Sequence, residues 1–371
     1  MVRRPSPRAY AGQWVLLIVT VAVAWILVHI ATYNLARRDL TFGFGFLFNR
    51  SNFDIPFRLV SWSEEDTYGR ALFVSALNTL LVASMGVVTA TLLGLLVGIM
   101  RLSVNWLARN VALAYVDFVR NTPQLIQIVF WYLAVLQSLP PPRQSIVLPA
   151  GMLLNIRGFY LPAASMGEDS QIFSWLALLA ILAIPFAWRI KIGGAHLRGK
   201  ALLLVPVAIA LFAFGVDHIS WPTLQGFNIV GGIQVPPELV ALWAGLSIYS
   251  SAFIAEIVRG SIEAIPKGQS EAALSLGLKP RQRLFLVILP QALRIMVPQM
   301  TSQYLNLIKS TTLGEAVAYP EIFQIFAGTV MQQASKEIET IIIVMVLFLS
   351  INLITSAFMN WYNRRVALIE N

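Results

Sequence analysis

The chain has 371 residues, of which 57% are hydrophobic and only 12% are charged, and its mean hydropathy is +0.70. Because soluble domains average about 25% charged residues, this composition excludes an ordinary soluble protein and indicates an integral membrane protein. The absence of cysteine excludes disulfides and thiolate chemistry, and three distant histidines make a histidine metal site unexpected. The net charge of +9 is expected to reflect the orientation of membrane loops rather than nucleic-acid binding.

Long apolar segments predict an all-α protein that spans the lipid bilayer about eight times, since a helix needs about 20 apolar residues to cross it. The predicted spans are 13–33, 71–100, 112–137, 171–189, 200–217, 237–258, 286–309 and 339–361. They divide the chain into four parts. These are an N-terminal tail with the first helix and an outer loop (1–70), two parts of a helical core (71–137 and 237–371), and an insertion with two extra spans (138–236).

The distribution of Lys and Arg favours a topology with both termini in the cytoplasm. The bias is clearest in 189–200, which holds four basic residues and no acidic one. This topology also places the polar segment between the spans 237–258 and 286–309 in the cytoplasm. Proline and glycine mark the segments expected as outer loops, at 140–143, 151–167 and 215–237.

The polar cytoplasmic segment 260–290 carries a spaced pattern of small, acidic and helix-breaking residues. Its members are Glu271, Ala272, Ala273, Gly277, Leu289 and Pro290. Alanines favour a slim helix, and Glu271 is expected near the helix start, where a carboxylate suits the helix dipole. Gly277, followed by Lys279 and Pro280, predicts a helix end and a restart. We therefore expect a stiff helical knob.

This pattern resembles the EAA loop of ABC importer permeases, which reads EAA, three residues, Gly, nine residues, Ile, any residue, Leu-Pro, with Val287 here at the Ile position. Other segments resemble the polar amino-acid branch of that family. They are, in chain order, Ser75–Ala83 with Asn78-Thr79, Arg120–Pro123 (which lacks the usual Gly), 249–269 and Lys309–Leu313. The insertion, the run LPPPRQSI and the tail FMNWYNRRVALIE are most like the first permease subunit of the general L-amino acid permease systems.

The resemblance implies a type I ABC importer permease core in the bacterial inner membrane, importing amino acids by ATP-driven alternating access. It implies that the six knob residues couple to an ATPase, and that this chain has no catalytic activity and no cofactor of its own. ATP and Mg²⁺ would bind to a partner ABC ATPase dimer. The other implied partners are a homologous second permease subunit, a periplasmic amino-acid-binding protein and the amino-acid substrate.

Polar residues inside spans are costly and are therefore candidates for the substrate path. Gln299, Gln303, Asn306 and Ser310 share one helix face, and amides offer both donors and acceptors to a zwitterion. An equal alternative is a stripe that bonds to the partner permease. Lys309 is a further candidate, although snorkelling to the outer surface is favoured. Asn121, Thr122 and Gln124 form, with Gln127, a second polar patch whose alternative role is packing at a helix end.

The rival function is an ion-coupled secondary amino-acid transporter, which would need a buried acid and an inverted repeat. Glu256 is the one candidate acid, and no repeat is visible. Glu256 is instead expected to pair with Arg259, joined by Arg120 and Arg294. The Gly94-x-x-x-Gly98 pattern is interpreted as close helix packing.

Overall fold

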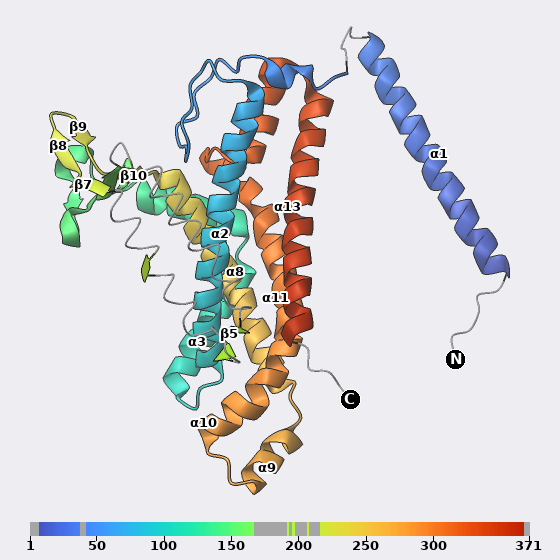
Figure 1. Cartoon of the computed structure of the whole chain (residues 1–371), viewed down its shortest axis with the longest axis vertical. Helices are drawn as coiled ribbons and strands as arrows, with labels where there is room; N and C mark the ends of the chain where they lie inside the picture. The colour runs from blue at the N-terminus through green and yellow to red at the C-terminus, as the bar shows by residue number, and fades with distance from the viewer. Residues whose placement is uncertain are drawn as a thin grey trace.

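The computed structural model describes residues 7–37, 42–166, 191–192, 195–196, 206–207 and 216–366, and long helices dominate it (Figure 1). The longest of the described helices are α1 (Pro7–Arg37), α2 (Tyr68–Arg101), α8 (Pro237–Glu263), α11 (Leu289–Ser310) and α13 (Glu337–Val366). Within the described residues, four helical stretches are long and apolar enough to cross a membrane, at 68–101, 237–263, 280–317 and 337–364. They confirm the predicted spans 71–100, 237–258, 286–309 and 339–361. The predicted spans 171–189 and 200–217 lie almost entirely outside the described residues.

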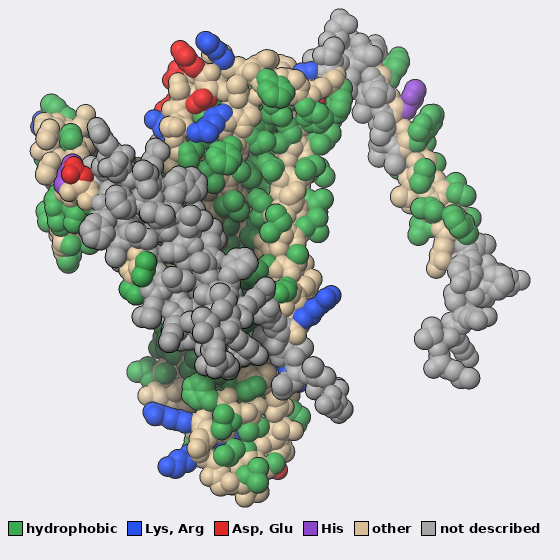
Figure 2. All heavy atoms as spheres, viewed as in Figure 1, with side chains coloured by type: hydrophobic (Ala, Val, Ile, Leu, Met, Phe, Trp, Pro, Cys, Tyr) green, Lys and Arg blue, Asp and Glu red, His purple; other side chains and the backbone are tan. Residues whose placement is uncertain are grey.

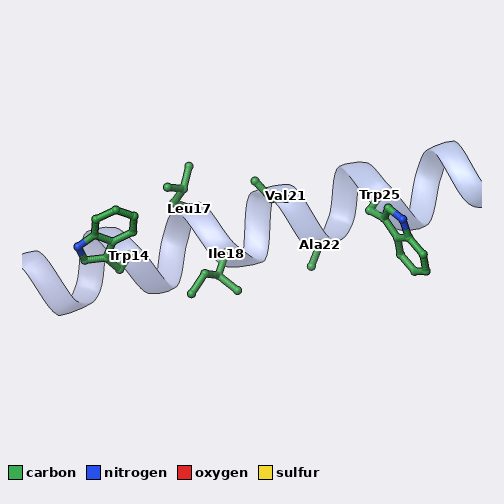
Figure 3. A pocket seen from close by; sticks show the side chains of 6 residues that line it. All are labelled: Trp14, Leu17, Ile18, Val21, Ala22 and Trp25. Carbon is green, nitrogen blue, oxygen red and sulfur yellow. The ribbon is translucent and has the colours of Figure 1, made fainter.

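Helix α1 covers the predicted first span and exposes its apolar side chains. Figure 3 shows a shallow apolar surface lined by six residues of this helix alone: Trp14, Leu17, Ile18, Val21, Ala22 and Trp25. Their spacing of three and four residues puts them along one side of the helix. Because no second element among the described residues contributes to this surface, it is suited to lipid or helix packing rather than to enclosing a small ligand.

Helices α2 and α8 form the centre of the bundle, and glycines bring them close together. A Cβ added at Gly94 would lie 2.5 Å from Ile254 Cγ2, and one added at Gly98 would lie 2.8 Å from Val258 Cβ. Only residues without a side chain fit at these two positions, as close approach of membrane helices requires. The interpretation of the GxxxG pattern as packing is therefore confirmed.

The predicted single span 112–137 is wrong, because the helix breaks in its middle. Helix α3 (Trp106–Asn121) ends before Thr122, whose φ of −102° and ψ of 128° are extended. The chain resumes as α4 (Gln124–Val129) and continues as the π-helix η2 (Phe130–Leu136). Pro123 explains the break, since its ring disfavours the helical conformation of the preceding residue.

A small polar lock joins the N-terminal half of α2 to the segment that follows α11. The amide of Asn78 donates to the carbonyl oxygens of Phe57 and Pro320, both at 2.9 Å. The backbone N–H of Ile322 donates to Thr79 Oγ1 at 3.0 Å, and Tyr319 Oη donates to the carbonyl of Asn78. These bonds explain why Asn and Thr stand together at 78–79, since each satisfies buried backbone groups.

Four short helical elements, from the segments before α2 and after α11, accompany this lock. They are η1 (Gly45–Phe48), η6 (Thr311–Val317), η7 (Gln324–Val330) and α12 (Met331–Ala334). A buried cluster that includes Phe46, Tyr68 and Phe326 packs η1, η7 and α12 against α2 and α13. Val317 of η6 belongs to a second cluster, with Tyr319 and with Leu242 of α8.

The segments expected as outer loops in the insertion contain short antiparallel strands and 3-10 turns. One sheet has the order β1-β2-β3-β10, and two further pairs are β4-β7 and β8-β9. The bounds are β1 Ile146–Val147, β2 Leu153–Asn155, β3 Gly158–Leu161, β4 Ala163–Met166, β7 Val216–Ser220, β8 Thr223–Gln225, β9 Asn228–Val230 and β10 Ile233–Val235. The turns are η3 Pro142–Gln144 and η4 Pro149–Gly151, and a separate pair joins β5 Lys191–Ile192 to β6 Ala195–His196. Figure 1 shows β7 to β10 at the side of the bundle.

Candidate functional site

The predicted knob is two short helices that project from one end of the bundle (Figure 1). Helix α9 (Lys267–Ser275) stops at Gly277, whose φ of +74° is left-handed. The N–H of Gly277 donates to Leu274 and that of Leu278 to Ala273, the paired bonds of a Schellman helix end. Lys279 is then extended, and its N–H donates to the side chain of Gln282 as α10 (Pro280–Arg283) begins. The predicted helix end and restart are confirmed.

The knob presents one buried and several exposed residues of its motif. Ala273 is buried, whereas Glu271 and Ala272 are exposed. Leu276 is 80% exposed, and Leu274 is exposed beside it, and Figure 2 shows hydrophobic side chains on the surface of this end of the molecule. The expected position of Glu271 at the helix start is wrong. It is the fifth residue of α9, beyond the first turn, because the helix already begins at Lys267.

A single helical stretch connects the knob to the middle of the bundle. Helix α10 passes into the π-helix η5 (Leu284–Ile288) and then into α11, so that 280–317 is one apolar helical stretch. The N–H of Leu289 donates to Leu284 across the wider π turn. Pro290 follows at once, and a π turn is one way in which a helix accommodates a residue that lacks an N–H. Leu289 and Pro290 therefore lie inside this helical stretch rather than in a loop.

Most of the polar residues predicted for the substrate path meet at one hollow of about 310 Å³. Its lining comes from α4, α8 and α11: Gln124, Tyr249, Ser250, Phe253, Gln303, Asn306, Leu307, Lys309 and Ser310. The structure thus brings Gln124 to the same place as four predicted residues of α11. Lys309 supplies the positive charge of the lining, which contains no carboxylate. Such a set of amides, hydroxyls, aromatic rings and one ammonium can bind a small polar molecule with an anionic group.

Three predicted residues lie outside the hollow. Gln299 is exposed on α11, one turn before Gln303. Asn121 donates to the carbonyl of Asp117, and Thr122 Oγ1 donates to that of Phe118. Gln127, buried nearby, donates to the carbonyls of Val119 and Thr122 at 2.9 and 3.2 Å. The second polar patch therefore consists largely of side chains that satisfy the backbone at the break between α3 and α4.

A charge cluster lies between the hollow and the knob, centred on Glu256 of α8. Its carboxylate pairs with Arg259 at 2.9 Å, as predicted, and with Arg120 at 4.0 Å. Arg101 at the end of α2 also pairs with it. The guanidinium of Arg120 lies 5.1 Å from the ring centroid of Phe253, which lines the hollow. The cluster thus fastens α2, α3 and α8 together next to the hollow.

Two expectations about this cluster need correction. In the described part of the chain Arg294 pairs with no carboxylate, because it projects from α11 and the cluster is built on α2, α3 and α8. Arg101 was missed, since no local spacing connects it to Glu256 in the sequence. Glu256 is also not the one buried acid. Glu321 is wholly buried, and its carboxylate accepts from the N–H groups of Phe323 and Gln324 at 2.9 and 2.7 Å.

A bundle of helices long and apolar enough to span a membrane, with a projecting helical knob and a polar hollow, has the architecture expected of a membrane transport protein. The chain belongs to the family described as "Binding-protein-dependent transport system inner membrane component", whose model matches residues 90–368. This membership confirms the predicted family and the type I permease fold, and it places the protein among permease subunits.

Several relatives are similar over nearly the whole chain. It is 42% identical over 99% of its length to the putative amino-acid ABC transporter permease protein YhdX of Escherichia coli, covering 96% of that protein. It is also 42% identical over 99% of its length to the general L-amino acid transport system permease protein AapQ of Rhizobium johnstonii, covering 94%. The glutamate/glutamine/aspartate/asparagine transport system permease protein BztB of Rhodobacter capsulatus is 34% identical over 96% of this chain and 92% of its own length.

Proposed function

We propose that this chain is a permease subunit of a binding-protein-dependent ABC importer that moves amino acids, over a broad range of L-amino acids, into the cytoplasm. The observation that carries the proposal is the helical stretch that joins the knob to the polar hollow. Similarity to YhdX and AapQ over 99% of the chain supports the substrate class. Because the similarity extends through the insertion, it supports the type of transport system as well as the permease core.

In the proposed mechanism the energy source lies on other chains. Two ABC ATPase subunits bind ATP and Mg²⁺ and receive the knobs of this chain and of a homologous second permease. An exposed helix end with Leu274, Leu276 and Ala272 on its surface is suited to a groove on such a subunit. When the ATPases close, the knobs move and the helices that line the hollow open outward. A periplasmic amino-acid-binding protein then delivers the substrate, and hydrolysis restores the inward-open state.

We place the substrate path at the hollow of Gln124, Gln303, Asn306, Lys309 and Ser310. The amides can donate to a carboxylate and accept from an ammonium without a fixed charge that would trap the substrate. Lys309 is an exposed residue that lines the hollow, and we assign it to attracting the carboxylate of the substrate. Asn121, Thr122 and Gln299 lie outside the lining, and we assign them to the approach or to the interface with the second permease.

The orientation follows from the knob. A coupling knob must be cytoplasmic, and α1 begins and α13 ends toward the end from which α9 and α10 project (Figure 1). We infer that both termini are cytoplasmic in the inner membrane of a bacterium. The excess of Lys and Arg in the predicted inner segments supports the same orientation.

Purification of the tagged chain from its native membrane under mild conditions tests this function. We expect a second homologous permease and an ABC ATPase to accompany it, with ATP turnover that rises when an amino-acid-loaded binding protein is added. A stable particle without an ATPase would overturn the proposal. So would amino-acid uptake that survives ATP depletion but stops when the ion gradient collapses, because that result defines the ion-coupled alternative.

A further inference from the structure

The strand unit of the insertion exposes an apolar surface that the transport mechanism above does not use. Its exposed apolar side chains include Val147, Ile219, Trp221, Phe227, Val230 and Ile233. Phe227 at the turn between β8 and β9 is 72% exposed. Figure 2 shows these strands carrying a group of hydrophobic side chains at the side of the bundle. We call the six residues the strand face. An exposed group of this kind normally marks a contact with another protein or with a membrane.

The chain leads directly from the strand face toward the bilayer. Strand β4 ends at Met166, five residues before the predicted span 171–189, and β7 begins at Val216, within the predicted span 200–217. The two strands pair antiparallel from Ala163↔Ser220 to Met166↔Val216. The two strands therefore pair at places in the chain that adjoin the outer ends predicted for both spans. Trp221 follows β7 immediately, so only a few extended residues, about 3.3 Å each, separate it from the end of the predicted span 200–217.

The tip of the β8-β9 hairpin brings an aromatic ring and cationic side chains together. Gly226, with a φ of +63°, makes the tight turn, and Phe227 projects next to it. The guanidinium of Arg143 lies 3.7 Å from the centroid of the Phe227 ring, and Arg157 donates to Asn228 at 3.0 Å. In the described residues of 138–166 and 216–235 the only acidic side chain is Asp217, which contacts His218. The tip is therefore apolar and cationic.

We propose that the strand face rests on the outer leaflet of the bilayer, with Trp221, Phe227 and Val230 at the level of the acyl-chain boundary. Arg143 and Arg157 then contact the lipid phosphates. Aromatic residues are enriched at this level in membrane proteins. With a cation held beside an aromatic ring, the ring can contact the acyl-chain boundary while the cation contacts the phosphate layer. The position of the strands beside the helices, rather than over the outer end of the bundle, favours a lipid surface over a docked protein (Figure 1).

The absence of cysteine from the chain allows a direct test in proteoliposomes of the purified complex. An environment-sensitive fluorophore is attached at Val230→Cys, with the unsubstituted complex as the background for labelling of other subunits. We expect strong quenching by lipids brominated on the acyl chain and weak quenching by iodide. Two controls set the scale. Leu353→Cys, exposed on α13, should report lipid, and Glu65→Cys, exposed in the outer segment, should report water.

A second pair of variants shows whether Phe227 holds the face in place. On the Val230→Cys background, Phe227→Asp should raise iodide quenching several-fold and lower quenching by brominated lipid. Phe48→Asp replaces another highly exposed phenylalanine and should change neither. Iodide quenching at position 230 equal to that of the Glu65→Cys control would overturn the proposal. So would protection from iodide that appears only when the binding protein is added, since the occupant would then be a protein.

Discussion

Replacing Gly94 by alanine should destabilise the helix bundle, and the structure sets the size of the effect. The added Cβ would lie 2.5 Å from Ile254 Cγ2 and 2.9 Å from the carbonyl oxygen of Ser251. Since carbon atoms pack at about 3.5–4.0 Å, α2 and α8 would have to separate by roughly 1 Å. Overpacking of this kind costs about 1–3 kcal/mol. We expect a clear fall in the midpoint of thermal unfolding of the complex, measured in mild detergent as the fraction that remains monodisperse after heating.

Gly260 provides the matched control on α8. It is exposed, and an added Cβ would meet no atom within 4 Å. In a helix interior, alanine is favoured over glycine by roughly 0.5–1 kcal/mol, so Gly260→Ala should leave the midpoint unchanged or raise it. Both variants replace glycine by alanine. The opposite changes expected in the unfolding midpoint therefore come only from the close packing at Gly94. Equal midpoints for the two variants would refute the close contact between α2 and α8.

Three further sets of substitutions test the hollow, the charge cluster and the knob. Gln303→Leu and Asn306→Leu should reduce uptake and change its amino-acid profile in cells where the protein inserts normally; unchanged uptake would assign the stripe to the permease interface instead. Glu256→Gln should lower the thermal midpoint, because it removes the carboxylate around which three arginines gather. At this partly exposed place the loss of stability should be about 1–3 kcal/mol. The control Glu263→Gln, at a more exposed carboxylate, should cost less than about 1 kcal/mol. Gly277→Asp should leave the protein in the membrane but abolish ATP hydrolysis coupled to transport.

Most of the helical core could be predicted from the sequence, because each span is a long apolar run bounded by polar residues. The knob could be predicted as well, since Gly277 and Pro280 impose a stop and a restart through local backbone chemistry. These features depend on residues near one another in the chain. The same holds for the pair of Glu256 and Arg259, which is one helical turn apart.

The features that sequence analysis missed depend on contacts between distant segments or on competition between local signals. Arg101 reaches Glu256 only because α2 and α8 pack together, and Glu321 is buried by the lock around Tyr319. The break at Pro123 was missed because the apolar residues on either side were joined into one span across the polar run Arg120–Thr122. The row of polar residues on α11 was predicted from its helical spacing. The hollow forms only because Gln124 of α4 lies next to that row, and the sequence does not show this.

Gly277 lies in the knob and not in the lining of the hollow. Its substitution therefore tests coupling separately from substrate binding and is the most informative one. An added Cβ there meets no atom within 4 Å, so no packing inside the bundle is lost. The left-handed φ of +74° is unfavourable for most residues by about 1–2 kcal/mol, and aspartate tolerates it better than most. Gly277→Asp should therefore keep the fold and the hollow, while it places a charge on the surface offered to the ATPase. Labelled substrate should still bind to the complex, and ATP hydrolysis should no longer respond to the loaded binding protein. Wild-type coupling in this variant would show that α9 and α10 are not the contact through which the ATPase acts.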